Sequence, residues 1–167
     1  WAPRRLDFYH ISPQDGYSQE WYKQLSLHEL RHTLQFSKMN QGFGKFVGLL
    51  TGQQGAAAIV GLFLPLWFIE GDAVVTETAF SSSGRGRQSV FEAGLKAQLV
   101  EKGIYSYDKA YFGSYRDKVP DVYELGYFLV GYNRNKFGND IWLRALDMTA
   151  RQTWRLNPFS AGLKKLS

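Results

Sequence analysis

The stretch 24-QLSLHELRHTLQF-36 combines the spacing of an amphipathic helix with two of the three histidines in the chain. His28, His32 and Phe36 recur four residues apart, which places them on one face of a helix. Leucines between them widen that face. The sequence therefore predicts a helix over residues 19–40, ended by the glycines that follow it.

The composition indicates a folded chain with a sizeable core. It has 167 residues, of which 44% are hydrophobic and 16% aromatic. The net charge is +5 without a dense run of Lys and Arg, so no nucleic-acid partner is expected. The absence of cysteine excludes disulfides and thiolate metal sites. We expect a single domain over residues 1–167 that is a fragment of a longer chain.

The remaining pattern favours a mostly α (α+β) fold. Residues 6–12 are aromatic and β-branched, which predicts a short strand. The further expected elements are a helix or helix pair over 45–63 interrupted near 52–55, a helix from Pro65 to about 79, helices over 88–101, 121–137 and 139–153, an irregular stretch over 104–120, and a fading helix or linker over 157–167.

One apolar segment has the length of a membrane span. No charged residue lies between Lys45 and Glu70. The polar patch 51-TGQQG-55, Pro65 and the glutamate at the end argue against spanning. We therefore expect a buried pair of core helices and no membrane span in this part of the chain.

The spacing of the two histidines points to a metal site. Residues i and i+4 of a helix lie one turn apart, so His28 and His32 can direct both imidazoles at one point. Zinc accepts imidazole nitrogens in tetrahedral geometry. Glu29, one step round the helix, can reach a water at the metal and act as its general base. This is the HExxH pattern of zinc hydrolases.

A catalytic zinc needs a third protein ligand. The stretch 67-WFIEGDAVVTE-77 offers Glu70 and Glu77, which lie two turns apart on one helix face. One carboxylate can bind the metal while the other accepts a hydrogen bond from a ligand histidine. His10 is an alternative ligand, and Asp72 is expected to be a charge on the helix surface.

The two stretches together resemble the gluzincin peptidases, in the aminopeptidase-N-like and peptidase MA-like branch. That family combines HExxH with W-x-x-E-G-x-A and a further glutamate seven residues after the first. The resemblance implies a zincin-like fold with a helical lobe. It implies zinc on His28, His32 and Glu70, with Glu29 as the general base. It also implies that Glu77 orients a zinc ligand.

A later stretch, 123-YELGYFLVGYNRNKFG-138, resembles the Y-x-x-G helix of the same branch. The resemblance implies that Tyr123 donates a hydrogen bond to the tetrahedral intermediate, with Tyr127 as the alternative. Between these stretches, 81-SSSGRGR-87 has the composition of an exposed loop. Its two arginines could recognise a substrate carboxylate, but exposure without such a role is favoured.

The expected function is zinc-dependent hydrolysis of a peptide bond by a metal-bound water with a glutamate base. The substrate would be a peptide or protein. From the resemblance we expect an extracytoplasmic location and a further C-terminal domain in the full chain. Two alternatives stay open: a non-catalytic zincin-like module of a larger envelope or secreted protein, and a metallohydrolase of a non-peptide substrate. Exopeptidase and endopeptidase action are not distinguished.

Overall fold

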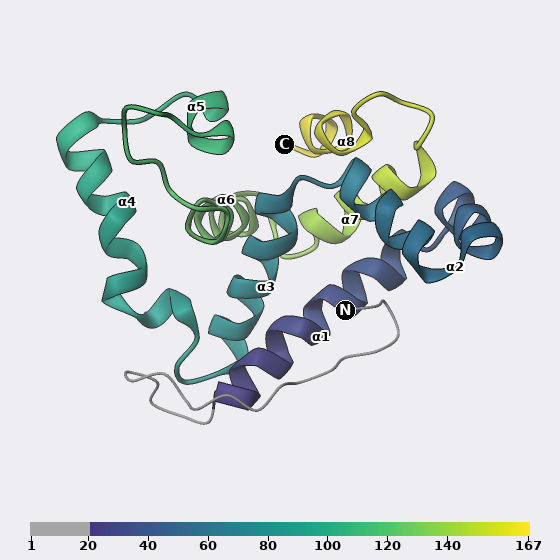
Figure 1. The fold of residues 1–167 in the computed structure, drawn as a ribbon, viewed down its shortest axis with the longest axis horizontal. Helices are drawn as coiled ribbons and strands as arrows, with labels where there is room; N and C mark the ends of the chain where they lie inside the picture. The colour runs from purple at the N-terminus through teal and green to yellow at the C-terminus, as the bar shows by residue number, and fades with distance from the viewer. Residues whose placement is uncertain (1–20) are drawn as a thin grey trace. The chain divides into compact units, whose positions relative to one another are not determined.

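The computed structural model describes residues 21–167, which are mostly helical and contain no strand (Figure 1). The strand expected over residues 6–12, and with it His10, lies outside the described residues. The elements are α1 (Trp21–Met39), α2 (Gly42–Phe63), α3 (Leu66–Phe80), the short 3-10 helix η1 (Arg85–Arg87), α4 (Ser89–Lys102), α5 (Tyr107–Phe112), α6 (Val122–Phe137), α7 (Ile141–Arg151) and α8 (Pro158–Leu166).

The described residues form two compact units. The α3–α6 unit comprises residues 21–28 and 66–131, and the α7–α8 unit comprises residues 29–65 and 132–167. Helices α1 and α6 each contribute residues to both units.

Most of the expected helices are confirmed, and two segments are more ordered than the sequence predicted. Residues 104–120 contain the helix α5, whose first turn is capped by Ser106 accepting a hydrogen bond from the backbone N–H of Lys109. At the C-terminal end, α8 is a regular helix rather than a linker. Asn157 caps it in the same way, and Pro158 occupies its first turn.

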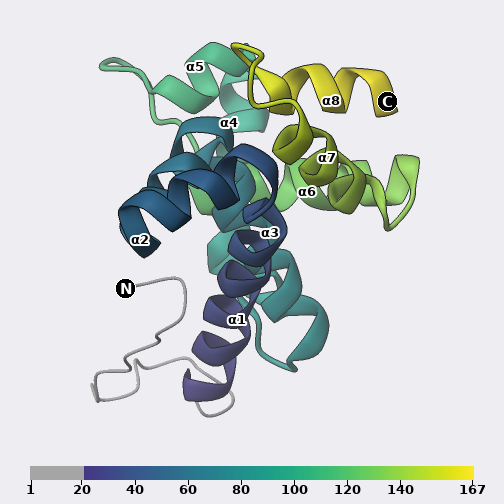
Figure 2. The ribbon, with the colours of Figure 1, turned by 90° about the vertical axis from the view of Figure 1, so that its right-hand side faces the viewer.

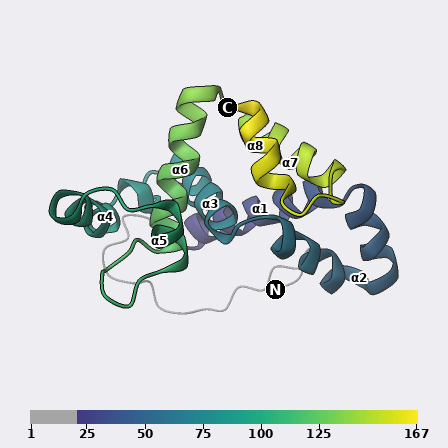
Figure 3. The ribbon, with the colours of Figure 1, turned by 90° about the horizontal axis from the view of Figure 1, so that it is seen from above.

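Within the α3–α6 unit, two glycines allow α3 and α6 to approach closely (Figure 3). A Cβ built on Gly71 of α3 would overlap the backbone of Gly126 in α6. A Cβ on Gly126 would overlap the carbonyl oxygen of Trp67. Because no side chain separates the two backbones here, α3 carries its glutamates close to the helix that carries Tyr123.

Within the α7–α8 unit, α7 and α8 lie side by side (Figure 2). Trp142 of α7 stacks on Phe159 of α8, with ring centroids 6.2 Å apart and an interplanar angle of 6°. Both residues are buried: Trp142 is 1% exposed and Phe159 is 2% exposed. Burial of two large aromatic rings supplies much of the apolar contact that holds the short α8 in place.

The expectation that residues 45–63 form a buried pair of core helices is wrong, because α2 is mostly exposed. It has the expected interruption, because Gly52 is non-helical with φ 73° and ψ −163°, and its backbone therefore kinks there. Burial is not as expected: 11% of its most apolar 18-residue window is buried, and Leu49 is 82% exposed. Helix α2 is long and apolar enough to cross a membrane, a match of length and composition only. The apolar composition of this segment predicted its burial, but composition does not specify whether another part of the described chain packs against the helix.

Candidate zinc-binding site

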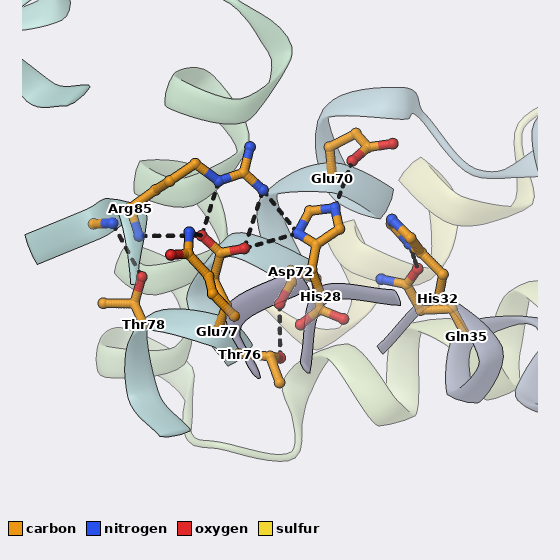
Figure 4. Close-up of polar contacts among 11 residues, drawn as sticks. His28, His32, Gln35, Glu70, Asp72, Thr76, Glu77, Thr78 and Arg85 are labelled. Carbon is orange, nitrogen blue, oxygen red and sulfur yellow. Dashed lines mark hydrogen bonds and ion pairs between the residues drawn. The ribbon is translucent and has the colours of Figure 1, made fainter. Parts of the chain in front are cut away.

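His28 is the centre of the site in the α3–α6 unit. Its side chain is 7% exposed and lies between two carboxylates of α3 (Figure 4). Its Nε2 lies 3.2 Å from Oε2 of Glu70, and its Nδ1 lies 3.0 Å from Oε2 of Glu77. The two glutamates predicted from the sequence thus face opposite nitrogens of the same ring. In this arrangement one carboxylate could serve as a metal ligand while the other accepts a hydrogen bond that orients the ring.

The distance between His28 and Glu70 fits a shared zinc ion. Ligand atoms bound at 2.0–2.2 Å to a tetrahedral zinc lie about 3.3 Å apart. The observed separation of Nε2 and Oε2 is 3.2 Å. Imidazole nitrogen and carboxylate oxygen are also the ligand types of catalytic zinc sites. The ligand types and the separation of this one pair therefore suit zinc, and 3.2 Å is also the length of a hydrogen bond between the two groups.

The other two residues of the HExxH stretch lie on α1 as predicted. The ligand atoms of His28, Glu29 and His32 all lie within 4.8 Å of one another. His32 is 5% exposed, and its Nδ1 lies 3.1 Å from Oε1 of Gln35, one turn further along the helix. If Nδ1 carries the proton, Nε2 presents its lone pair, which is the tautomer that a metal ligand requires. Glu29 is half-buried.

Glu77 is buried at the end of α3, where a carboxylate needs strong partners. Its side chain is 1% exposed. Burial alone would raise the pKa of Glu77. The hydrogen bonds with His28 and Arg85 and the charge of Arg85 outweigh burial and lower this pKa to about 2. For His28, burial lowers the pKa, but the hydrogen bonds with Glu70 and Glu77 outweigh it, and the net shift is upward.

Arg85 belongs to the site, which the sequence did not predict. It was expected in an exposed loop, but it begins η1 and binds Glu77 three times (Figure 4). Its backbone N–H and its Nε donate to Oε1 at 3.1 and 2.8 Å, and its Nη2 donates to Oε2 at 3.0 Å. Arg87, by contrast, is exposed, and its Nε donates to the carbonyl oxygens of Thr78 and Ser81. No local sequence pattern pairs Arg85 with a carboxylate eight residues earlier.

Tyr123 lies beside this cluster. Its ring centroid is 6.3 Å from that of His28, and the guanidinium of Arg85 stands 4.7 Å above its ring. The alternative, Tyr127, packs its ring against Phe91 and directs its hydroxyl to the carbonyl of Gly86 at 3.5 Å. Of the two tyrosines, Tyr123 is the one in contact with His28 and Arg85.

Two glutamines complete the hydrogen bonding of the site. Gln24 donates from Nε2 to Oε1 of Glu77 at 3.0 Å, and Gln35 contacts His32 as described above. Both glutamines lie one turn from a histidine on α1, a spacing that could have identified them.

The expectation for Asp72 is wrong, because this residue, expected on the helix surface, is fully buried. Hydrophobic periodicity could not predict this burial, because the apolar side chains of α3 are distributed around the whole helix and mark no single buried face.

No protein-family model, curated protein or solved structure matches this chain.

Proposed function

We propose that this protein is a zinc-dependent peptidase of the gluzincin kind with a zincin-like domain. His28, His32 and Glu70 would hold the zinc ion, and Glu77 would orient His28. The substrate would be a peptide or protein outside the cytoplasm. The observation that carries the proposal is the position of the His28 ring, with Glu70 at one nitrogen and Glu77 at the other.

The chemistry of each residue follows from its type and position. Zinc, when bound, would activate water and polarise the carbonyl of the scissile bond. Glu29 would take a proton from the attacking water and deliver it to the leaving amine. Tyr123 would donate its phenolic hydrogen to the oxygen that becomes negative in the transition state. The water adds to the carbonyl carbon, the C–N bond breaks, and the products are an acid and an amine.

Zinc content tests the metal site first. The protein is purified, stripped of metal, loaded with one equivalent of zinc and freed of excess, and its zinc is measured by elemental analysis. We expect about one zinc per chain in the wild type and much less in Glu70→Ala. Glu101→Ala, at an exposed position of α4, is the matched control and should retain zinc. Absence of zinc from the wild type would overturn the proposal. Equal zinc in wild type and Glu70→Ala would remove Glu70 from the ligand set and make His10 or Glu77 the next candidate.

Activity on a quenched peptide library then separates the proposal from its alternatives. Cleavage by wild type that is lost in Glu29→Gln supports a peptidase. A protein that binds zinc stoichiometrically but cleaves no peptide would instead be a non-catalytic module or a hydrolase of another substrate class. The site of cleavage, at a terminus or within the peptide, also decides between exopeptidase and endopeptidase action.

A further inference from the structure

We propose that Arg85 is a positioning residue of the zinc site, which acts by fixing the carboxylate of Glu77 against His28. The inference rests on the proposed zinc site and names a residue that the resemblance does not assign. Its basis is the set of contacts that Arg85 makes with both of those residues inside the α3–α6 unit.

Arg85 holds both oxygens of the Glu77 carboxylate. Two of its N–H groups donate to Oε1, and Nη2 donates to Oε2. Gln24 adds a further donor to Oε1. A carboxylate with this many fixed donors has little rotational freedom, because any rotation would break several charge-assisted hydrogen bonds at once. The orientation of Oε2 toward His28 is thus set from the side of Arg85.

The nitrogen Nδ1 of His28 has two neighbours that make opposite demands. Oε2 of Glu77 lies 3.0 Å away and can only accept, whereas Nη2 of Arg85 lies 2.8 Å away and can only donate. When Nδ1 donates to Glu77, a neutral ring presents the Nε2 lone pair, as metal binding requires. When Nδ1 accepts from Arg85, Nε2 carries the proton and donates toward Glu70. If Nε2 of His28 were a metal ligand, Nδ1 would have to donate to Glu77, and Nη2 of Arg85 would remain bonded to Oε2 of Glu77.

The charge of Arg85 has two opposing effects on a zinc ion nearby. It repels the cation, but it also neutralises Glu77, whose side chain is 1% exposed. Removal of one partner from a buried ion pair leaves an uncompensated charge. The remaining carboxylate then lowers its free energy by moving toward solvent, where water can hydrate it. Such a movement would break its bond to His28. We therefore expect loss of the hydrogen-bonded arrangement to outweigh relief of the repulsion.

The guanidinium also positions Tyr123, because it lies over that ring at 4.7 Å. A cation above a tyrosine ring is attracted to its π-electrons. One side chain thus contacts the carboxylate that orients a zinc ligand and the tyrosine proposed to stabilise the oxyanion. This second contact gives the same substitution an effect on turnover as well as on metal affinity.

The test is the zinc dissociation constant, measured by competition with a chromophoric chelator. We expect Arg85→Met to raise this constant by about 10-fold or more, the usual effect of losing a group that supports a metal ligand. Arg85→Lys keeps the charge without the planar fork and should lie between wild type and Arg85→Met. Arg87→Met is the matched control from the same 3-10 helix, and its constant should stay close to that of wild type. Circular dichroism of the metal-free proteins verifies that each variant is folded.

A double-mutant cycle with Glu77→Gln tests whether Arg85 acts through Glu77. We expect Arg85→Met to weaken zinc binding much less in the Glu77→Gln background than in wild type. Equal effects in the two backgrounds, or unchanged or tighter zinc binding in folded Arg85→Met, would overturn the role of Arg85 while leaving the zinc site intact. Failure of the wild type to bind zinc would instead overturn the proposed function, and the two failures are therefore distinguishable.

Discussion

Gly71 of α3 and Gly126 of α6 lie in direct backbone contact, so that a Cβ on either residue would overlap the main chain of the other helix. Gly71 directly follows Glu70, and Gly126 lies one turn after Tyr123. The close approach of two helix backbones therefore sets the separation between two residues assigned to the site. Neither glycine has a chemical role, but the geometry of the site depends on both.

Gly126→Ala should destabilise the protein and weaken zinc binding. The added methyl would overlap the carbonyl oxygen of Trp67 and force α3 and α6 apart, and such overpacking typically costs about 1–3 kcal/mol. Gly131→Ala, on the same helix, is the control, because its Cβ would meet nothing within 4 Å. Gly131→Ala should stabilise by about 0.4–1 kcal/mol. Urea unfolding of the metal-free proteins measures the free energy of unfolding of each variant. Equal stability of the two variants would contradict the close packing of α3 against α6.

Glu29→Gln should abolish most peptidase activity and retain zinc. The amide cannot accept the proton of the attacking water, and loss of a general base costs about 10²–10⁴-fold in kcat. Zinc stoichiometry should stay at the wild-type value, because Glu29 is not assigned as a ligand. Turnover of a quenched peptide and zinc content are measured on the same preparation. Loss of zinc together with activity would show that Glu29 supports the metal instead.

Tyr123→Phe should lower kcat by about 100-fold or more, because it removes a hydrogen-bond donor needed in the transition state. KM should change much less, since the ring and its contact with Arg85 remain. Tyr127→Phe is the matched control, because the Tyr127 hydroxyl faces the carbonyl of Gly86 rather than the site. If Tyr127→Phe lost more activity than Tyr123→Phe, the assignment of the two tyrosines would be reversed.

The stability of the metal-free protein should fall in acid because of Glu77. The pKa of this carboxyl is lowered from 4.5 to about 2. A carboxyl with a depressed pKa in the folded state binds protons more strongly when unfolded. Its contribution to stability is therefore fully present above about pH 4.5 and is lost as the pH falls toward 2. Free energies of unfolding in urea between pH 6 and pH 2 measure this loss. Glu77→Gln should show a shallower decline over that range, and identical slopes would contradict the ion pair with Arg85.

The sequence predicted best where short-range spacing decides the structure. The boundaries of α1, α4 and α6 follow from helical periodicity and from the glycines that end or follow them. The grouping of His28, Glu29 and His32, whose ligand atoms lie within 4.8 Å of one another, needs only the turn of one helix. The pairing of His28 with Glu70 and Glu77, by contrast, joins residues more than 40 positions apart. The spacing of the two glutamates on one helix face made them candidates, and the resemblance alone assigned Glu70 to the metal and Glu77 to a ligand histidine.

The amino-acid pattern alone predicted most of the helices, an interruption near 52–55 in the helix that is α2, and residues whose type and spacing suit a metal site. These features depend on backbone preferences and on neighbours within one or two turns. The exposure of α2, the burial of Asp72 and the binding of Glu77 by Arg85 became visible only in the folded chain. Burial and ion pairing depend on which distant surfaces meet, and an apolar or charged residue does not specify its partner in its own sequence.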